Sequence, residues 1–284
     1  MAGAAADDKY RPADPVPLDA LVAGALEDTA RGPQPVTSTG FGDLDGLLGG
    51  LRPGALWVIT GRSGSGKTVL ASDLARSAAI SQGVPTLCMV PLGAADALAQ
   101  RVLAAEGRVP LNGLRHGGLG VEDMLRLQRT GDLVAGAPLL VAEARRADAQ
   151  VLRRHLAAAE VLIRLAVVDG LPQAAVGPAG LDAFRELARE HGVCIVVIAE
   201  QDLDELDAQL RRFEQRADVV LTVHRDDQSD RFSSRAGEAD LIVSRNCDGP
   251  VATVVVAFQG HYGRFAQLCG PTQAAAAAGP VETC

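Results

Sequence analysis

An eight-residue segment near position 65 has the residue types and spacing of a phosphate-binding loop. It fits the pattern GxxxxGK[ST], with a β-like apolar run before it and a helical pattern after it. In such loops backbone N–H groups and a helix N-terminus attract phosphates, a lysine reaches the β and γ phosphates, and a hydroxyl coordinates Mg²⁺. The flanking patterns argue against the alternative, an accidental glycine- and serine-rich turn. The segment consists of Gly61, Arg62, Ser63, Gly64, Ser65, Gly66, Lys67 and Thr68.

The lysine of this segment is unusual in a chain that otherwise uses arginine. Of 27 basic residues, only Lys9 and Lys67 are lysines. A compact ammonium on a flexible stem differs chemically from a planar guanidinium, so the two are not interchangeable at a phosphate. Chance is the simpler explanation, but the position of Lys67 favours a specific need for an ammonium group.

A carboxylate ends a second apolar run. Leu165–Val168 predicts a buried strand, and Asp169 follows it directly. Ligands bind at the carboxyl ends of parallel strands, so we expect Asp169 to hold Mg²⁺, through water, beside Thr68. An ordinary strand-end aspartate that caps a turn is the alternative.

The elements that must position these residues alternate along the chain. Apolar strands are predicted at 55–60, 86–90, 139–141, 165–169 and 193–199, and the patterns between them predict helices up to 81 and at 94–106, 121–130, 149–162 and 181–191. Strands without long helices between them follow at 219–223, 240–244 and 251–258. The pattern predicts an α/β domain over residues 36–270, with a mainly parallel sheet covered by helices on both faces and an antiparallel C-terminal extension.

The two ends of the chain differ from this domain. Residues 1–16 are rich in Ala, Asp and Pro and are expected to be disordered, and residues 271–284 form a low-complexity tail. Residues 17–35 contain a predicted helix over 17–31 whose apolar residues recur at helical spacing, which requires a surface to bury them. Those apolar residues are Leu18, Leu21, Val22, Ala25 and Leu26.

Composition excludes several classes of protein. The 284 residues carry a net charge of −8 and only 3% aromatic side chains, which argues against bulk attraction to nucleic acid and against an extended base-stacking platform. Five scattered cysteines and five histidines show no metal-ligand spacing. No apolar run is long enough to cross a bilayer and the start lacks a signal-peptide plan, so no membrane partner and a cytoplasmic location are expected.

The motifs together resemble one family. Residues 36–68 resemble the start of the C-terminal motor domain of DnaB-type replicative DNA helicases, and the similarity extends over about residues 17–268. RecA-like relatives of the RadA and KaiC kind share the segment Thr39–Phe41 and the phosphate loop but resemble the chain less at residues 214–215 and 225–227. The further matching segments are 101–107, 167–169, 187–190, 199–201, 214–218, 224–227 and 245–250.

The resemblance implies a RecA-like P-loop NTPase that hydrolyses ATP with Mg²⁺ in DNA replication. It implies a homo-oligomeric ring, a hexamer in the family, assembled through the helix at 17–31. Gln201 matches a glutamine that senses the γ-phosphate; a solvated amide at a strand end is the alternative. Single-stranded DNA and another helicase or replication protein are the implied partners.

Two catalytic positions depart from the family. The residue that matches the family's catalytic glutamate is Leu92, and the nearest carboxylate is Asp96. The family's Lys-x-Arg pair, whose arginine enters the neighbouring nucleotide site, is matched by Arg245 and Cys247. Arg245 is the remaining candidate for that role, although it could equally bond to its own turn. These departures predict weak hydrolysis.

The segments that line the DNA channel in the family also differ. Residues 170–180 contain no basic residue, and residues 202–209 are acidic where phosphates would have to be held. Arg211 and Arg212 could compensate, but a pair of arginines on a helix is more often solvated.

Three functions remain open from the sequence. The first is a weak Mg-ATPase of the DNA helicase class with uncertain unwinding. The second is a catalytically impaired module in which nucleotide controls assembly or regulation. The third is an ATPase similar to RadA or KaiC.

Overall fold

The computed structural model describes residues 17–19, 22, 26, 36–201, 206–230 and 232–268. The chain divides into two units, Met1–Pro35 and Val36–Cys284. In the first unit the helical residues that are described are Leu18, Asp19, Val22 and Leu26, and all four are exposed. The rest of the helix expected at 17–31, and the tails expected at 1–16 and 271–284, lie outside the described residues.

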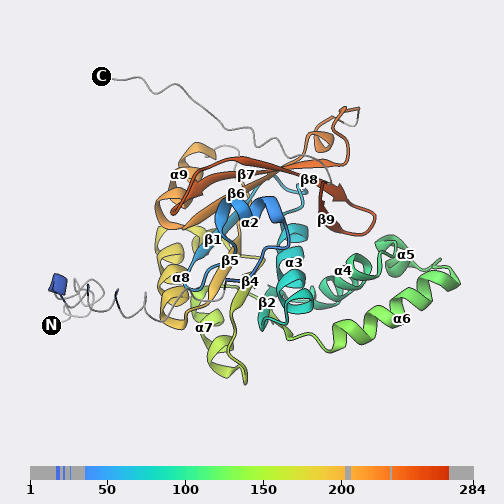
Figure 1. Cartoon of the computed structure of the whole chain (residues 1–284), viewed down its shortest axis with the longest axis horizontal. Helices are drawn as coiled ribbons and strands as arrows, with labels where there is room; N and C mark the ends of the chain where they lie inside the picture. The colour runs from blue at the N-terminus through green and yellow to red at the C-terminus, as the bar shows by residue number, and fades with distance from the viewer. Residues whose placement is uncertain are drawn as a thin grey trace, which may run out of the picture. The chain divides into compact units, whose positions relative to one another are not determined.

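The second unit is built on a nine-stranded sheet with the order β3-β2-β4-β5-β1-β6-β7-β8-β9 (Figure 1). The first six strands of this order are parallel, and the last three continue the sheet in antiparallel pairs. The strands are β1 Leu56–Thr60, β2 Thr86–Pro91, β3 Leu139–Ala144, β4 Leu165–Val168, β5 Cys194–Ile198, β6 Val219–His224, β7 Glu238–Asn246, β8 Thr253–Gln259 and β9 Arg264–Gln267.

The central strands are buried on both faces. Every residue of β1, β4 and β5 is buried, in agreement with apolar runs that show no alternation. In β7, by contrast, buried and partly exposed residues alternate, as expected for a strand that packs on one face. The mainly parallel sheet with an antiparallel C-terminal extension is therefore confirmed.

Helices cover both faces of the sheet. On one face α2, α3 and α4 pack on side chains such as Trp57 and Ile59, and on the other α7, α8 and α9 pack on Leu56 and Val58. The helices are α2 Gly42–Leu48, α3 Lys67–Arg76, α4 Ala95–Gly107, α5 Leu111–His116, α6 Val121–Ala135, α7 Ala149–Ala158, α8 Pro178–His191 and α9 Leu206–Arg216. A π-helical turn, Ser77–Ser81, extends α3, and 3-10 turns lie at Gln173–Val176 and Asp226–Gln228.

Local sequence signals explain several helix ends. Asp148 caps α7 by accepting a hydrogen bond of 2.9 Å from the Val151 N–H. Pro178 begins α8, where its fixed φ suits the first turn, and Gly192 ends it in the left-handed conformation. These caps set the residues at which α8 begins and ends, and the helix between them packs against β5.

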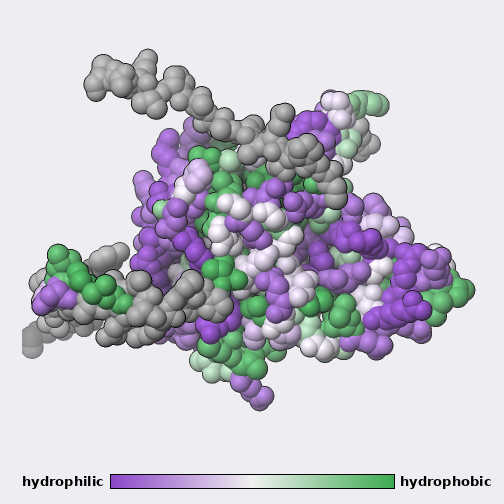
Figure 2. All heavy atoms as spheres, viewed as in Figure 1, coloured by the Kyte–Doolittle hydropathy of each residue, from purple (hydrophilic) through white to green (hydrophobic). Residues whose placement is uncertain are grey.

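The helices α5 and α6 extend from the body at one end of the sheet (Figure 1). Hydrophilic side chains dominate the face of this region that Figure 2 shows, with hydrophobic ones interspersed. Its exposed apolar residues include Val121, Met124, Leu125 and Leu133 on α6. In the part of the chain that the structure describes, no helix has the length and hydropathy required to span a membrane.

Candidate nucleotide-binding site

The predicted phosphate loop connects β1 to α3. Gly61, Gly64 and Gly66 have φ values of +146°, +78° and +109°, which favour glycine. A Cβ on Gly66 would lie 2.8 Å from the Phe265 ring, and one on Gly61 would lie 2.6 Å from the Val223 carbonyl oxygen. The loop therefore needs glycine at both positions for conformation and for space. It ends at the N-terminus of α3, where backbone N–H groups attract anions.

Lys67 lies across this loop. Its Nζ donates hydrogen bonds to the carbonyl oxygens of Gly61 at 3.0 Å and Arg62 at 2.9 Å. Burial lowers the pKa of Lys67, while the carboxylates of Glu200 and Asp169 oppose that shift. An ammonium has three donors, so one remains for a phosphate oxygen.

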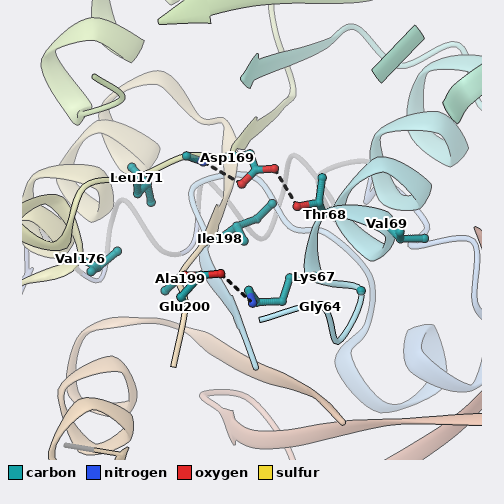
Figure 3. A pocket seen from close by; sticks show the side chains of 12 residues that line it. Gly64, Lys67, Thr68, Val69, Asp169, Leu171, Val176, Ile198, Ala199 and Glu200 are labelled. Carbon is teal, nitrogen blue, oxygen red and sulfur yellow. Dashed lines mark hydrogen bonds and ion pairs between the residues drawn. The ribbon is translucent and has the colours of Figure 1, made fainter. Parts of the chain in front are cut away.

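Thr68 and Asp169 meet as the sequence predicts. The Thr68 hydroxyl donates to Asp169 Oδ2 at 2.9 Å, and the Gly170 N–H donates to Asp169 Oδ1 at 2.7 Å (Figure 3). A hydroxyl and a carboxylate are oxygen ligands of the kind that Mg²⁺ prefers, and Mg²⁺ keeps several waters and substrate phosphates as its other ligands. The two side chains thus fit a magnesium ion held between α3 and the end of β4.

These residues line a cavity of about 550 Å³ at the carboxyl ends of β1, β4 and β5 (Figure 3). A volume of this order lies in the range of small-molecule sites. The lining residues are Gly64, Gly66, Lys67, Thr68, Val69, Asp169, Gly170, Leu171, Val176, Ile198, Ala199 and Glu200.

Gln201 lies beside the phosphate loop, but its neighbour Glu200 lines the cavity. The Gln201 N–H donates to the Gly61 carbonyl oxygen at 3.2 Å. The Glu200 carboxylate lies 3.8 Å from Lys67 Nζ and is 70% exposed. Glu200 is not among the site residues expected from the sequence, although a carboxylate that follows β5 lies at the same edge of the sheet as Asp169. The residue expected there is its neighbour Gln201.

The end of β2 brings no carboxylate into the cavity. Leu92 follows β2 and is 56% exposed, and Asp96 lies exposed in the first turn of α4. Neither residue lines the cavity. The carboxylate of Glu143, on the neighbouring β3, accepts a hydrogen bond of 2.9 Å from the Ala95 N–H and so caps α4.

Arg245 and Cys247 lie at the opposite edge of the sheet. Because β7 is antiparallel to β6, its end at Asn246 pairs with Val219, the first residue of β6. The five-residue β1 spans about 16 Å between the two edges. Arg245 pairs with Val220 through the backbone, but it is exposed, and its side chain makes no hydrogen bond or ion pair with another described residue. Neither residue can reach the cavity of its own chain.

Arg52 lies beside Cys247, although it is not among the site residues expected from the sequence. Arg52 Nη2 is 3.6 Å from Cys247 Sγ, and its guanidinium pairs with Asp248. Arg185 and Arg189 line the same open depression of about 400 Å³. No spacing rule could find this cluster, since it joins the segment before β1, the helix α8 and the end of β7.

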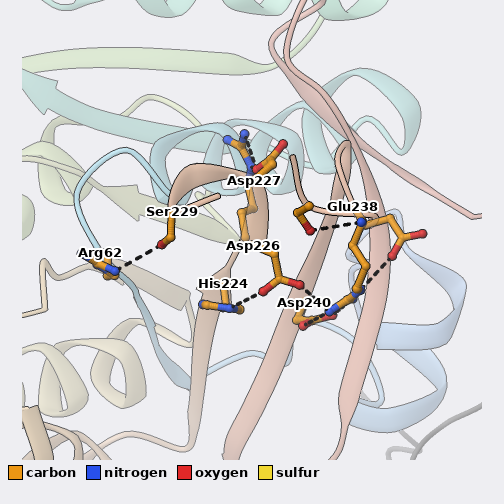
Figure 4. A network of polar contacts seen from close by, with 10 residues as sticks. Arg62, His224, Asp226, Asp227, Ser229, Glu238 and Asp240 are labelled. Atoms are coloured by element: carbon orange, nitrogen blue, oxygen red, sulfur yellow. Dashed lines mark hydrogen bonds and ion pairs between the residues drawn. The ribbon is translucent and has the colours of Figure 1, made fainter. Parts of the chain in front are cut away.

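A polar network near the phosphate loop is built from hydrogen bonds and ion pairs (Figure 4). Asp226 pairs with His224 at 3.0 Å and with Arg235 at 3.2 Å, and Asp227 pairs with Arg225 at 2.9 Å. Among the described residues, no group of three or more His, Cys, Asp or Glu side chains could hold a metal ion. Beside this network, the Arg62 side chain donates to Ser229 Oγ at 3.4 Å.

The segments expected to face DNA are only partly described. Residues 170–180 form a loop with the 3-10 turn and the start of α8. Residues 202–205 of the acidic segment lie outside the described residues, and the remainder begins α9, which also carries Arg211 and Arg212.

Sequence comparisons with known proteins match most of the chain. A profile of the family described as the DnaB-like helicase C-terminal domain matches residues 37–267. The replicative DNA helicase DnaB of Leifsonia xyli subsp. xyli (strain CTCB07) is 32% identical over 289 residues, covering 90% of this chain and 62% of the relative. That of Treponema pallidum (strain Nichols) is 32% identical over 250 residues, covering 80% of this chain and 55% of the relative. The chain thus spans somewhat more than half the length of these relatives.

Solved structures show the same fold at lower sequence identity. The ATPase domain of G40P superimposes with a TM-score of 0.76 and 19% identity, covering 90% of this chain and all of that one. A DnaB-like replicative helicase, described with its interactions with primase, also superimposes with a TM-score of 0.76 and 19% sequence identity, covering 90% of this chain and 67% of that one. The RadB recombinase superimposes with a TM-score of 0.55 and 17% sequence identity, covering 82% of this chain and all of the recombinase. The RecA-like α/β fold is confirmed.

Proposed function

This chain belongs to the DnaB-like helicase C-terminal domain family, and we propose that it binds Mg-ATP in the cavity beside Lys67 and hydrolyses it slowly. The contact between Thr68 and Asp169 at the mouth of the phosphate loop carries the proposal. It brings a magnesium-binding pair to the N-terminus of α3, where the β and γ phosphates would lie. Lys67 has a donor available for those phosphates.

Slow hydrolysis is proposed from what surrounds the cavity. The end of β2 offers the apolar side chain of Leu92 where the family has a glutamate, and Cys247 stands where the family has an arginine. A missing general base costs about 10²–10⁴-fold in rate, and a missing arginine finger costs about 10³–10⁵-fold. We expect turnover below about 1 s⁻¹ per subunit.

The chain is proposed to act as a homo-oligomer, with a hexameric ring as in the family. Leu18, Val22 and Leu26 are exposed at helical spacing and would be covered by a second copy. Arg245 and Arg52 lie on the edge of the sheet that faces away from their own cavity, so they could serve only the nucleotide of a neighbour. Single-stranded DNA and a helicase or replication protein are the proposed further partners.

A second function is favoured by one specific observation. Lys67, Thr68 and Asp169 line the cavity, while the family's positions for the base and for the finger carry Leu92 and Cys247. In a regulatory module of this kind, bound nucleotide would control assembly without driving movement along DNA.

The first test is steady-state ATP hydrolysis with and without single-stranded DNA. We expect slow turnover in the unaltered protein and its loss in Lys67→Ala, because the variant lacks the ammonium that contacts the phosphates. Stimulation by DNA would support the helicase class. Tight ATP binding without turnover would support the regulatory module, and equal turnover in Lys67→Ala would contradict the proposed site.

A further inference from the structure

Among the described residues, two carboxylates with different surroundings line the cavity. Asp169 is bonded to the Thr68 hydroxyl and the Gly170 N–H, so it is engaged with the proposed magnesium pair. The Glu200 carboxylate makes no hydrogen bond with another described residue, and its one charged neighbour in that part of the chain is Lys67 Nζ at 3.8 Å. Glu200 is thus a charged group of the cavity that the proposed function does not use.

We propose that Glu200 is the general base of ATP hydrolysis in this chain, acting from β5 in place of a carboxylate at the end of β2. The inference rests on the proposed function, since it needs ATP in the cavity beside Lys67. It assigns a catalytic role to a residue that follows a different strand from the one that carries the base in the family.

The backbone of Glu200 is held from both sides. Before it, the Ala199 N–H donates to the Ile59 carbonyl oxygen at 2.9 Å, and after it, the Gln201 N–H donates to the Gly61 carbonyl oxygen at 3.2 Å. The buried side chain of Gln209 donates to the Glu200 carbonyl oxygen at 2.9 Å. These bonds fix the residue between the end of β5 and the phosphate loop, while its side chain stays free to turn toward a water molecule.

The distance to Lys67 places the carboxylate where the chemistry requires it. Lysine in this position contacts the γ-phosphate, so a carboxylate 3.8 Å from its Nζ lies beside the space that this phosphate would occupy (Figure 3). A general base must come within about 3 Å of the proton that it takes, directly or through one water. Rotation of the exposed Glu200 side chain can bring it to a water next to the phosphate.

The step balances without another reactant. Glu200 takes a proton from water as the water oxygen bonds to the γ-phosphorus. The bond from that phosphorus to the bridging oxygen breaks, and its electron pair leaves with ADP. Because Glu200 is exposed, the proton then returns to solvent or to the phosphate product.

The other nearby carboxylates are less suitable. Glu143 is occupied in capping α4, and Asp96 does not line the cavity. A competing role for Glu200 is electrostatic repulsion of the γ-phosphate, which would slow hydrolysis by weakening ATP binding. The two roles predict opposite effects when the charge is removed, so a neutral isostere separates them.

The test compares Glu200→Gln with the unaltered protein. We expect kcat to fall by about 10²-fold or more, while the Kd for ATP changes by less than about threefold. Glu200→Asp should recover part of the loss. Asp96→Asn and Glu143→Gln are matched controls and should keep kcat within about threefold. Thermal unfolding of each variant checks that the fold is retained.

A second measurement does not depend on turnover. ADP with aluminium fluoride imitates the phosphoryl group under attack, so Glu200→Gln should weaken its binding more than that of ADP alone. Unchanged kcat in Glu200→Gln, or tighter ATP binding with faster turnover, would overturn the assignment. Absence of turnover in the unaltered protein would also overturn it. Failure of the unaltered protein to bind ATP would instead contradict the proposed function itself.

Discussion

Asp73 shows how a single buried carboxylate links α3 to the C-terminal hairpin. Its Oδ2 accepts a hydrogen bond of 2.6 Å from the Phe265 N–H, and its Oδ1 lies 3.1 Å from Arg76 Nη2. Burial raises the pKa of Asp73 to about 6, although Arg76, the Phe265 N–H and Arg264 favour the charged form. The group lies on α3, five residues after Thr68.

This pKa predicts a pH-dependent stability. The ordinary value is 3.8, so the folded protein holds the proton more tightly than the unfolded chain. The resulting stabilisation is complete below pH 3.8 and is lost as the pH rises through about 6. Relative to Asp73→Asn, which cannot titrate, the unaltered protein should lose about 2 kcal/mol of unfolding free energy between pH 4 and pH 7. Urea unfolding at both pH values measures this difference, with Asp96→Asn as a control. A difference that stays constant with pH would contradict the prediction.

At the scale of elements, the shape of the phosphate loop depends on β9 as well as on β1 and α3. The Phe265 ring of β9 packs against Gly66, the residue before α3, and against Phe258 of β8 with ring centroids 5.0 Å apart. The phosphate loop therefore packs against these two aromatic residues, although about 200 residues separate them from it in the chain.

A methyl group on Gly66 should disturb this contact. In Gly66→Ala the Cβ would meet the Phe265 ring at 2.8 Å with φ at +109°, so we expect about 1–3 kcal/mol of destabilisation and weaker ATP binding. The matched control is Gly46→Ala in α2, where no atom lies within 4 Å and the change should stabilise by about 0.5–1 kcal/mol. Thermal unfolding and ATP titration measure both effects. Normal stability and ATP affinity in Gly66→Ala would show that the loop does not depend on this packing.

The elements also show what the sequence can predict. The central strands follow from apolar runs, because burial on both faces selects apolar residues throughout, and α3, α4, α6, α7 and α8 follow from helical spacing, because burial on one face gives a helical period. The helices α2, α5 and α9 and the strand β9 are not among the predicted elements. No residue of α5 is buried, and the four residues of β9 are too few for a period to show.

The site divides in the same way. Lys67, Thr68 and Asp169 follow from local rules, since a loop after one strand and a carboxylate after another must meet at one edge of a parallel sheet. The proximity of Glu200 to Lys67, and of Arg52 to Cys247, depends on which strands are neighbours. The order of the strands depends on the packing of the whole sheet. No local sequence pattern near Glu200 or Arg52 predicts it.

At the scale of the whole molecule, the exposed residues of the N-terminal unit predict assembly. Leu18, Val22 and Leu26 recur every four residues on a helix and are exposed. In Leu26→Asp we expect the apparent dissociation constant of the oligomer to rise at least about tenfold, because a charge would enter an apolar contact. Sedimentation at several concentrations measures this. The control is Leu162→Asp, which replaces an equally exposed leucine in the second unit. An oligomer unaffected by Leu26→Asp would exclude assembly through this helix.

The direction of β7 gives each chain two unlike edges, with the cavity beside Lys67 at one and Arg52 and Arg245 at the other. Copies that associate head to tail match the arginine edge of one with the cavity of the next. An open row of such copies always leaves its terminal cavity unmatched, whereas a closed one completes every cavity. The rate of ATP hydrolysis per subunit would then show whether the ring has closed. A chain whose own cavity is inactivated would lose one active site, but its Arg52 and Arg245 would still be available to the cavity of the next chain.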